Sequence, residues 1–472
     1  MPPKHPIPAH KTFPHPTSTT SFWRTELSPL DTYRSTPNLP PTVDIAIIGS
    51  GMSGVSIAYH LLKTAAPESQ PSILILEARQ LCSGATGRNG GHTKLAAWHM
   101  QKAFDVPVPG GGRAGIEAAE EVIAFQVAQI TALKNVIEEE GIQCDFLQTR
   151  SFDVFLDEQL SGERVDMVRE KIAAGLKTAG REVQILDGQG TGVLSRDGVQ
   201  RITGVSCAYG ALNVPAAQLW PYKFVSGLLS SFIDKINFQT ETQVNSVSDI
   251  PDADGYHTLS TATRGEVRAK KVIFATNAYT PALLPDIYEH KIVPVRGTAS
   301  YVVRKDDGDS RFLDLQHRVN TYNLAYGGGM QDYLVHRPDG GVIFGGGYGV
   351  FGTHEELFRG TVDDSKVAME KEMREYFEKR MTTTWKDWAI SGAKVDRIWT
   401  GIMGATPDGY PHIGVVPGRR NQFICAGFNG AGMPHIFLSA KGLARMVNDG
   451  VEFKETGIPS IFESRLDRLK NW

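Results

Sequence analysis

Residues 43–54 read Val-Asp-Ile-Ala-Ile-Ile-Gly-Ser-Gly-Met-Ser-Gly, and this stretch decides the fold. Its first six residues form an apolar run of strand length that ends at Gly49. Gly49, Gly51 and Gly54 then complete the pattern G-x-G-x-x-G, whose glycines permit a tight turn, the approach of a pyrophosphate and close packing of a helix on the strand. The stretch therefore predicts the strand–loop–helix unit of a dinucleotide-binding fold.

The residues that follow complete a βαβ unit. Helical spacing of apolar side chains over 54–63 predicts a helix, and residues 72–77 (Ser-Ile-Leu-Ile-Leu-Glu) predict a second buried strand, so the sheet is expected to be parallel. The helix N-terminus supplies free N–H groups and positive potential for phosphates. Glu77, at the end of the second strand, can accept hydrogen bonds from ribose hydroxyls and would repel a 2′-phosphate, which disfavours NADP.

A second glycine-rich loop distinguishes FAD from NAD. Residues 82–94 read Cys-Ser-Gly-Ala-Thr-Gly-Arg-Asn-Gly-Gly-His-Thr-Lys, a loop for which an NAD dehydrogenase has no need. A longer flavin cofactor crosses the sheet edge there, where Ser83 and Arg88 could neutralise its pyrophosphate. Two further segments agree with a flavin cofactor: residues 274–279 end a predicted strand, and residues 427–432 open the final predicted helix. We therefore expect FAD, with an NAD-dependent dehydrogenase as an alternative.

Composition excludes several classes of protein. The 472 residues suggest about three domains at roughly 150 residues each. Lys and Arg number 49 and Asp and Glu 52, so the net charge of −3 argues against a nucleic-acid binder and is typical of a soluble globular protein. The four cysteines form no C-x-x-C pair, so neither a disulfide framework nor a metal site is indicated.

The first 42 residues form a proline-rich arm. They contain ten prolines and no apolar segment of the kind found in a secretory signal. We expect an irregular arm that wraps the surface, anchored by Trp23 and Tyr33. Since the chain also has no uninterrupted apolar run of about 20 residues, we expect no membrane contact and a cytoplasmic location.

Farther along the chain, helices and antiparallel strands are expected. Apolar spacing predicts a long helix over 113–140, a helix over 215–232 and an exposed helix over 363–380. Short runs at 301–304, 333–337 and 341–347, with a turn at 338–341, predict antiparallel strands.

At these motifs the chain resembles the D-amino-acid oxidase, or glycine–sarcosine oxidase, family of FAD-dependent oxidoreductases. Blocks at 49–54, 85–91, 275–278, 294–297 and 427–432 match in order, and their wording is most similar to the gamma-glutamylputrescine oxidase branch. The resemblance implies an α/β (overall α+β) fold, with a Rossmann-like FAD-binding domain and a discontinuous antiparallel-sheet substrate domain. The implied ranges are 1–42 for the arm, 43–112, 205–292 and 395–472 for the FAD-binding domain, and 113–204 and 293–394 for the substrate domain.

The resemblance also implies a set of cofactor contacts spread over six segments. The expected FAD-binding residues are Gly49, Gly51, Met52, Ser53, Gly54, Glu77, Ala78, Arg79, Ser83, Thr86, Gly87, Arg88, Asn89, Gly90, Gly91, His92, Val244, Thr276, Asn277, Gly401, Gly430, Ala431, Gly432 and Met433.

The family's chemistry is the removal of a hydride from the carbon next to an amine nitrogen by flavin N5. The product imine hydrolyses, and O₂ usually reoxidises the flavin and gives hydrogen peroxide. Sarcosine oxidase and related enzymes bind the substrate carboxylate with cations at positions that correspond here to Pro434 and Ala97. They attach FAD through a cysteine where this chain has Gly401. The resemblance therefore implies an amine substrate without a carboxylate near the flavin, and noncovalent FAD.

Four residues are candidates for the chemistry, each with a structural alternative. His92 is a histidyl attachment point, a polar active-site group or a structural histidine, and Lys94 either assists O₂ reduction or forms a structural salt bridge. Arg296 contacts the substrate or forms a buried ion pair, and Tyr326 belongs to an aromatic cage for an amine or to the core. A dehydrogenase with another acceptor and a flavin-binding protein without efficient turnover stay open, and the sequence does not define the oligomeric state.

Overall fold

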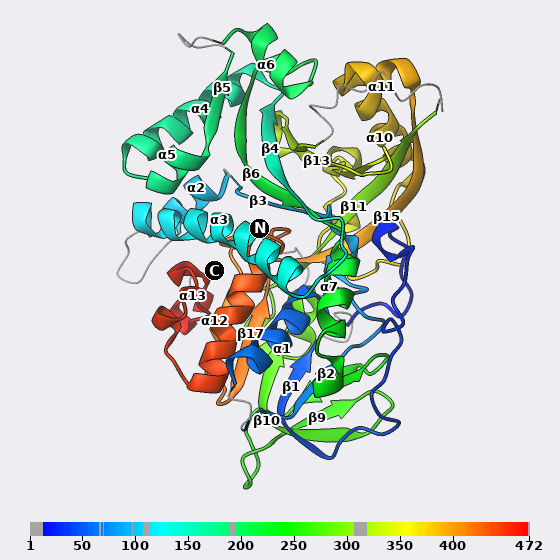
Figure 1. Cartoon of the computed structure of the whole chain (residues 1–472), viewed down its shortest axis with the longest axis vertical. Coiled ribbons are helices and arrows are strands. Elements are labelled where there is room, and N and C mark those ends of the chain that lie inside the picture. The colour runs from blue at the N-terminus through cyan, green and yellow to red at the C-terminus, as the bar shows by residue number, and fades with distance from the viewer. Residues whose placement is uncertain are drawn as a thin grey trace.

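A computed structural model of the chain describes residues 13–65, 68, 70–96, 98–106, 114–188, 194–305 and 319–470. The described residues fold around two sheets, which we call sheet A and sheet B. Sheet A and its helices fill the lower half of Figure 1, and sheet B fills the upper half. The predicted fold class is confirmed: a parallel dinucleotide-type sheet is combined with a largely antiparallel one.

Sheet A forms around the predicted βαβ unit. Strands β1 (Thr42–Ile48) and β2 (Ile73–Leu76) pair in parallel and are joined through α1 (Met52–Thr64). β2 is buried along its whole length, as expected for a strand that is covered on both faces. The strand order is β16-β17-β10-β1-β2-β7. In addition, β9 pairs with β10, and β8 pairs with β9. The remaining strands of sheet A are β7 (Asn237–Gln239), β8 (Val244–Val247), β9 (His257–Thr261), β10 (Glu266–Phe274), β16 (His412–Val415) and β17 (Gln422–Ala426).

Parallel pairing in sheet A brings four distant sequence blocks together. β1, β2, β10 and β17 all run in the same direction, so their carboxyl ends lie at one edge. The residues that follow these strands are Gly49, Glu77, Ala275 and Gly427, one from each motif. Ligands of open α/β sheets bind at this edge.

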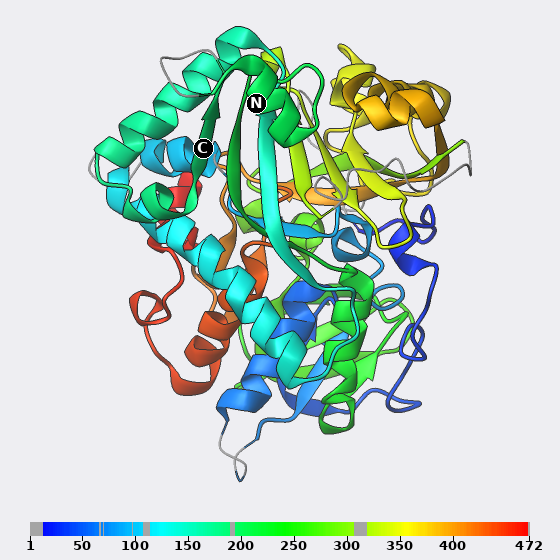
Figure 2. The same ribbon diagram turned by 45° about the horizontal axis from the view of Figure 1, so that its top comes forward.

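Sheet B is curled, as Figure 2 shows, and is antiparallel except for the β12–β4 pair. Its order is β15-β11-β14-β13-β12-β4-β6-β3, with β5 beside β6. β3 (His92–Lys94) directly follows the second glycine loop, so this loop connects the edge of sheet A to sheet B. The other strands are β4 (Leu147–Phe155), β5 (Gln184–Asp187), β6 (Gly210–Gln218), β11 (Val293–Arg304), β12 (Thr321–Ala325), β13 (Gln331–His336), β14 (Val342–Gly346) and β15 (Ala393–Ala405).

The helices cover both sheets and link them. α1 packs against α12 (Ile436–Asp449) and α7 (Pro221–Ser230) in front of sheet A, and α3 (Gly115–Glu139) crosses above them, in contact with α12 and sheet B (Figure 1). The other helices are α2 (Trp98–Asp105), α4 (Glu158–Ala173), α5 (Lys177–Glu182), α6 (Arg196–Thr203), α8 (Pro285–Tyr288), α10 (Glu370–Thr384), α11 (Lys386–Ser391) and α13 (Leu466–Lys470). None of the helices within the described ranges is long and apolar enough to cross a membrane.

Two predicted helices are wrong at their starts. The helix that was expected over 363–380 begins only at Glu370, as α10, and the other lies over 215–232. The range 215–232 was expected to be helical throughout, but Pro215 lies inside β6, opposite Arg150 of β4. α7 begins at Pro221, a first-turn position that suits proline because its N–H is not needed there. β6 and β3 belong to sheet B although the expected FAD-domain ranges include them, and the division into domains remains a prediction.

From residue 13 onward, the N-terminal arm follows an extended path along the protein. Trp23 is fully buried and serves as the expected anchor, whereas Tyr33 is 38% exposed. The short helix at Phe22–Arg24 carries this tryptophan into the protein next to the second glycine loop. The arm is thus part of the core as well as of the surface.

Candidate functional site

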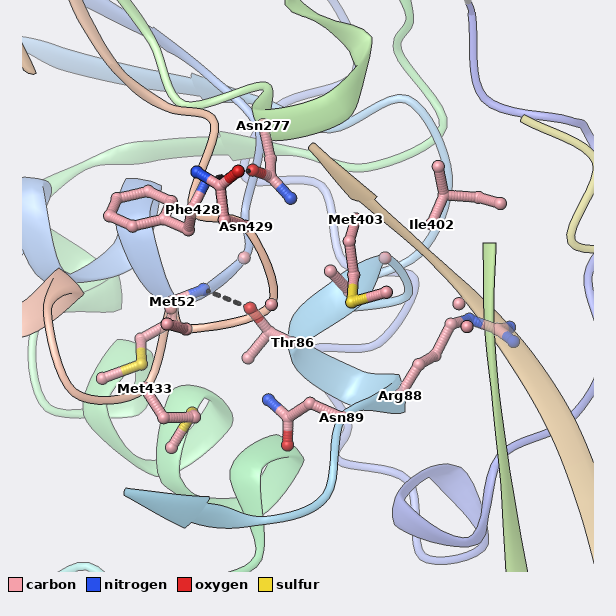
Figure 3. A pocket seen from close by; sticks show the side chains of 18 of the residues that line it. Met52, Thr86, Arg88, Asn89, Asn277, Ile402, Met403, Phe428, Asn429 and Met433 are labelled. Carbon is pink, nitrogen blue, oxygen red and sulfur yellow. Dashed lines mark hydrogen bonds between the residues drawn. The ribbon is translucent and has the colours of Figure 1, made fainter. Parts of the chain in front are cut away.

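A cavity of about 630 Å³ lies where the carboxyl edge of sheet A meets sheet B. Its walls come from the loops that follow β1, β2, β10 and β17, from the second glycine loop, and from strands β11 to β15. Figure 3 shows side chains from several of these segments turned toward a common space, among them Met52, Asn89, Met403 and Met433. The motifs that the sequence singles out thus meet at one cavity.

The first glycine loop has the geometry that its pattern predicts. Gly49 has φ +106°, and a Cβ there would lie 2.7 Å from the carbonyl oxygen of Ala275. A Cβ at Gly54 would lie 1.9 Å from the carbonyl oxygen of Gly49, so this glycine lets α1 pack on the loop. Gly51 instead lines the cavity, where it leaves room next to Thr86.

The second glycine loop closes over the start of α1. Thr86 Oγ1 accepts a hydrogen bond from the Met52 N–H at 3.1 Å, drawn as a dashed line in Figure 3. Glu77 is held next to the first loop, because its Oε2 accepts hydrogen bonds from Ser50 N (2.9 Å) and Ser50 Oγ (2.7 Å). The carboxylate therefore has a fixed place at the end of β2.

Asparagine side chains hold the block at 275–278 and the block at 427–432 together. Asn277 Oδ1 accepts hydrogen bonds from the N–H groups of Gly427 (3.1 Å) and Phe428 (3.2 Å). Asn429 Oδ1 accepts one from Thr406 N at 2.7 Å, and Asn429 Nδ2 donates to Thr406 Oγ1 at 2.9 Å. The loop that leads into α12 is thereby fixed against both sheets.

The cavity fits an adenine dinucleotide with a flavin. Gly51 offers backbone at the helix start with no side chain in the way, and the Glu77 carboxylate lines the wall at the end of β2. Arg79 Nε and Tyr279 Oη are buried donors on this wall with no hydrogen-bond partner in the described part of the chain. Buried donors are almost always satisfied in native proteins, so these two atoms indicate a polar ligand.

Most of the residues predicted to bind the cofactor line the cavity. Those that do are Gly49, Gly51, Met52, Ser53, Glu77, Ala78, Arg79, Thr86, Arg88, Asn89, Gly90, His92, Val244, Thr276, Asn277, Gly401, Gly430, Ala431, Gly432 and Met433. Gly54, Ser83, Gly87 and Gly91 lie behind this surface and give the loops their shape; a Cβ at Gly87, for example, would lie 2.2 Å from the carbonyl oxygen of Cys82.

Arg88 lines the cavity with its stem, but its guanidinium is bound elsewhere. Nε donates to the carbonyl oxygen of Ser83 (2.7 Å), and Nη1 donates to that of Thr400 (2.7 Å). Asp364, which is fully buried, lies 3.6 Å from Nε and also pairs with Arg79 at 3.0 Å. Figure 3 shows the Arg88 side chain directed away from the common space. In this arrangement, the guanidinium binds protein groups and does not face the place of the expected pyrophosphate.

Gly401 lies against Arg88 rather than facing open space. A Cβ at Gly401 would lie 3.0 Å from the Cβ of Arg88. A cysteine at this position would require Arg88 to move. The chain thus lacks the attachment residue at this position, and the Arg88 side chain packs against the glycine that replaces it.

His92 and Lys94 both line the cavity at the start of sheet B. Burial, and next the charge of Lys94, lowers the pKa of His92 to about 3, so its imidazole is neutral at ordinary pH. Lys94 Nζ forms a buried salt bridge with Asp153 on β4. His92 Nδ1 is buried and has no partner in the described part of the chain, which leaves it available to a ligand.

Arg296 and Tyr326 do not line the cavity. Arg296 donates to the carbonyl oxygens of Asp363 (3.0 Å) and Leu357, so it holds the loop before α10 through carbonyl groups. Within the described ranges, it forms no ion pair of the kind that the sequence suggested. Tyr326 Oη donates to Asp332 Oδ2 at 2.7 Å and thus lies behind a residue that does line the cavity. Neither position fits the direct substrate contact that the sequence suggested.

Sheet B contributes residues that sequence reasoning missed. Asp332 lines the cavity, where Tyr326 Oη, Tyr376 Oη (2.6 Å) and the Gly347 N–H (2.8 Å) donate to its carboxylate. Tyr333 faces Gly90, at which a Cβ would lie 2.6 Å from the tyrosine ring. The glycine-rich hairpin at 327–347 was a signal for such residues, but only strand pairing shows which side chains reach the cavity.

The cations of the cavity already have protein partners. Among the described residues that line it, the cationic side chains are Arg79, Arg88 and Lys94, and these are bound by Asp364, by backbone carbonyls and by Asp153, respectively. Pro434 lines the cavity at one of the two expected cation positions. The other, Ala97, lies outside the described residues.

Comparisons with known proteins agree with this geometry. The family model described as DAO, FAD dependent oxidoreductase, matches residues 44–446. Gamma-glutamylputrescine oxidoreductase of Escherichia coli is 22% identical over 416 residues, which cover 87% of this chain and 85% of that protein.

Among solved structures, glycine oxidase of Geobacillus kaustophilus superposes with a TM-score of 0.64 at 20% identity, over 88% of this chain and 96% of that one. L-proline dehydrogenase of P. horikoshii gives a TM-score of 0.64 at 19% identity, over 90% of this chain and 100% of that one. At these identities the structural likeness concerns the fold.

Proposed function

The chain belongs to the family of FAD-dependent oxidoreductases, and on that premise we propose that it oxidises the CH–N bond of an amine that carries no carboxylate on the reacting carbon. Bound FAD supplies the hydride acceptor. The residues of the chain bind and orient both reactants and set the charge around them. As a small-molecule oxidase of this kind, it would pass the two electrons to O₂ and release hydrogen peroxide, and the imine would hydrolyse separately in water.

One observation carries the substrate class: the described cations that line the cavity are all engaged by protein groups. A substrate carboxylate would have to displace Asp153 from Lys94, the cation that lines the cavity at the start of sheet B. Such an exchange brings no net gain in the free energy of binding, because one buried ion pair replaces another. An amine without a carboxylate needs no such exchange.

The other polar groups of the cavity suit a substrate whose reacting end carries no carboxylate. His92 is neutral and can exchange a hydrogen bond without adding positive charge that would repel an ammonium group. Tyr333, Tyr348 and Met330 add aromatic and thioether surface to the part of the cavity that sheet B forms. We assign substrate contact to His92 and Tyr333, charge balance to the Lys94–Asp153 pair, and support of Asp332 to Tyr326.

Noncovalent attachment of FAD is part of the proposal. It is supported by Gly401 and by the Arg88 side chain that packs on it. Acid precipitation of the purified protein is expected to leave all the yellow colour in the supernatant. Colour that stays in the pellet would contradict noncovalent attachment and would direct attention to His92.

A screen of amines with a peroxide readout tests the function. Purified protein is supplied in air with primary, N-methylated and diamine substrates, and in parallel with sarcosine, glycine and D-amino acids. We expect peroxide from members of the first group. If amines reduce an artificial dye but yield no peroxide, the O₂ assignment fails and a dehydrogenase is indicated. If neither readout responds to any amine, the proposed substrate class is wrong.

A further inference from the structure

We propose that residues 13–24 of the N-terminal arm are a functional part of the FAD site, a clamp that must be in place for the cofactor to be retained. We call this segment the arm clamp. The proposal concerns cofactor binding and is therefore independent of which amine is oxidised. It rests on three observations: what the arm clamp binds, what it covers, and how it is tied to sheet B.

The arm clamp binds the second glycine loop at successive points. Ser21 Oγ donates to the carbonyl oxygen of Gly87 at 2.5 Å, and Trp23 Nε1 donates to that of Asn89 at 2.6 Å. Arg24 Nη1 donates to the carbonyl oxygen of Leu81 at 2.5 Å. The carbonyls of Gly87 and Asn89 belong to the loop that closes over the start of α1, and Leu81 directly precedes that loop. In each case a side chain of the arm clamp is the donor.

Two arginines of the cofactor segments are in turn bound by the arm clamp. Arg88 Nη2 donates to Ser18 Oγ (2.5 Å) and to the carbonyl oxygen of Thr19 (2.6 Å), and Nη1 donates to Thr19 Oγ1 at 3.0 Å. Arg79 Nη1 donates to the carbonyl oxygen of His15 at 3.1 Å. Without the arm clamp, Arg88 would lose three of its hydrogen bonds and would be held only by Ser83, Thr400 and Asp364, so the loop that it shapes would be less firmly fixed.

The first residues of the arm clamp form part of the cavity wall. Phe13 and Pro14 line the cavity together with Ala78 and Arg79, next to Glu77, where a dinucleotide fold places the adenosine ribose. The same two residues line a second hollow of about 830 Å³, together with His15, Pro16 and residues 360–363. Phe13 and Pro14 therefore border both the cofactor cavity and this hollow.

The arm clamp is held down from the side of sheet B. Thr19 N donates to the carbonyl oxygen of Asp364 at 2.7 Å, and Thr400 N on β15 donates to Thr19 Oγ1 at 3.1 Å. Trp23 fits against Gly91, where a Cβ would lie 2.5 Å from the indole ring. The segment thus connects the second glycine loop to β15 of sheet B and holds both beside the cofactor cavity.

Two variants and one control test the proposal through the rate at which FAD leaves the holoenzyme. Truncation before residue 21 removes most of the arm clamp, and the double substitution Ser21→Ala with Trp23→Phe removes two donors but keeps an aromatic ring. Truncation before residue 13 is the matched control. After dilution into buffer, released FAD is followed by its fluorescence, and the thermal midpoint of each apoprotein is recorded separately.

We expect FAD to dissociate at least about tenfold faster from the double variant, the equivalent of one net hydrogen bond, and faster still from the longer truncation. The control is expected to match the wild type. A folded double variant that releases FAD at the wild-type rate would overturn the proposal, even if the longer truncation fails to fold. It would equally be overturned if the control truncation released FAD as fast as the longer one.

Discussion

Gly51 is the residue at which a side chain would interfere most directly with cofactor binding. It lines the cavity at the N-terminus of α1, and its neighbour Met52 donates its N–H to Thr86. The other two glycines of the motif face protein atoms, so their role is packing. Gly51 is therefore the position at which loss of binding can be separated from loss of fold.

Gly51→Val is expected to yield a folded protein without yellow colour. Its Cβ would lie 3.2 Å from Thr86 Oγ1, and its methyl groups would extend into the cavity. Gly327→Ala is the control, because a Cβ there meets its nearest neighbour at an ordinary 3.8 Å and lies outside the cavity. The flavin absorbance per protein of each purified variant is the measurement. A Gly51→Val protein that purifies yellow would show that the phosphate-loop assignment is wrong.

Lys94 and Asp153 form the buried pair at the entry to sheet B, and a double-mutant cycle separates its structural and chemical roles. Lys94→Met alone leaves a buried carboxylate uncompensated, which costs roughly 3–5 kcal/mol of unfolding free energy. Adding Asp153→Leu is expected to restore most of that stability, because both charges are then gone. Chemical denaturation of the wild type, both single variants and the double variant gives the coupling.

Turnover by the double variant completes that test. If the pair only balances charge, the double variant should keep its kcat for the reaction with O₂ within about tenfold of the wild-type value, a difference of roughly 1.4 kcal/mol. A stable double variant that has lost O₂ reactivity would instead assign the chemistry to Lys94 itself.

At the scale of elements, α3 joins the second glycine loop to the start of α12. Gln126 Oε1 accepts the Ala96 N–H at 3.0 Å, and its Nε2 lies 2.8 Å from His435 Nε2. Gln129 Nε2 donates to the carbonyl oxygen of Met433 at 2.9 Å, and its Oε1 accepts the Leu438 N–H at 2.9 Å. Both glutamines are fully buried, so one helix fixes two walls of the cavity.

Gln129→Ala is expected to lower the free energy of unfolding by about 1–3 kcal/mol, because it leaves a buried carbonyl and a buried N–H without partners. It should also weaken FAD binding, since Met433 lines the cavity. Gln148→Ala, on an exposed position of β4, serves as the control. Denaturation midpoints and FAD titration of the apoproteins check both effects. An unchanged FAD affinity would mean that α3 does not position this wall.

Local patterns explain which elements could be predicted. The βαβ unit over 43–77 was predicted because its strand, glycine and helix signals are contiguous in sequence. The start of α7 was misplaced because the segment at Pro215 joins β4 in a pairing between residues about 65 apart in sequence, which no local signal reports. Asp332 and Tyr333 escaped prediction for the same reason: they reach the cavity through the order of strands in sheet B.

The sequence also could not show which groups bind the charged side chains. Arg88 was expected at a pyrophosphate, but its guanidinium binds Thr19, Thr400 and the region of Asp364, which lie 69, 312 and 276 positions away along the chain. An arginine in a glycine-rich loop signals an anion, and only the fold shows that a protein carboxylate already meets it.

At the scale of the whole molecule, buried histidines make stability depend on pH. Burial lowers the pKa of His60 and of His435 to about 3, and places that of His412 well below its usual value. The unfolded chain takes up protons on these imidazoles below about pH 6.5, whereas the folded chain does not. Their contribution to stability is therefore complete above pH 6.5 and is lost as the pH falls toward 3.

We expect each of these histidines to cost roughly 1.4 kcal/mol of unfolding free energy per pH unit below about 6.5. His60→Leu, at a buried position of α1 against Phe437, should make the decline less steep, whereas His354→Gln on the surface should leave it unchanged. Urea unfolding at pH 7.5, 6 and 5 provides the measurement. Equal slopes for wild type and His60→Leu would show that His60 is protonated in the folded protein.

The measurement that tests the account most directly is anaerobic reduction of the bound flavin by a matched pair of substrates, an N-methylated amine and the N-methylated amino acid that differs from it by a carboxylate on the reacting carbon. The visible absorbance of the holoenzyme is followed after mixing, so the result does not depend on the electron acceptor. We predict that the amine bleaches the flavin and that the amino acid does so more slowly, because Lys94 and Arg79 are already paired and Pro434 carries no charge. An amino acid that reacts more than about tenfold faster than its amine, a difference of roughly 1.4 kcal/mol, would contradict the account.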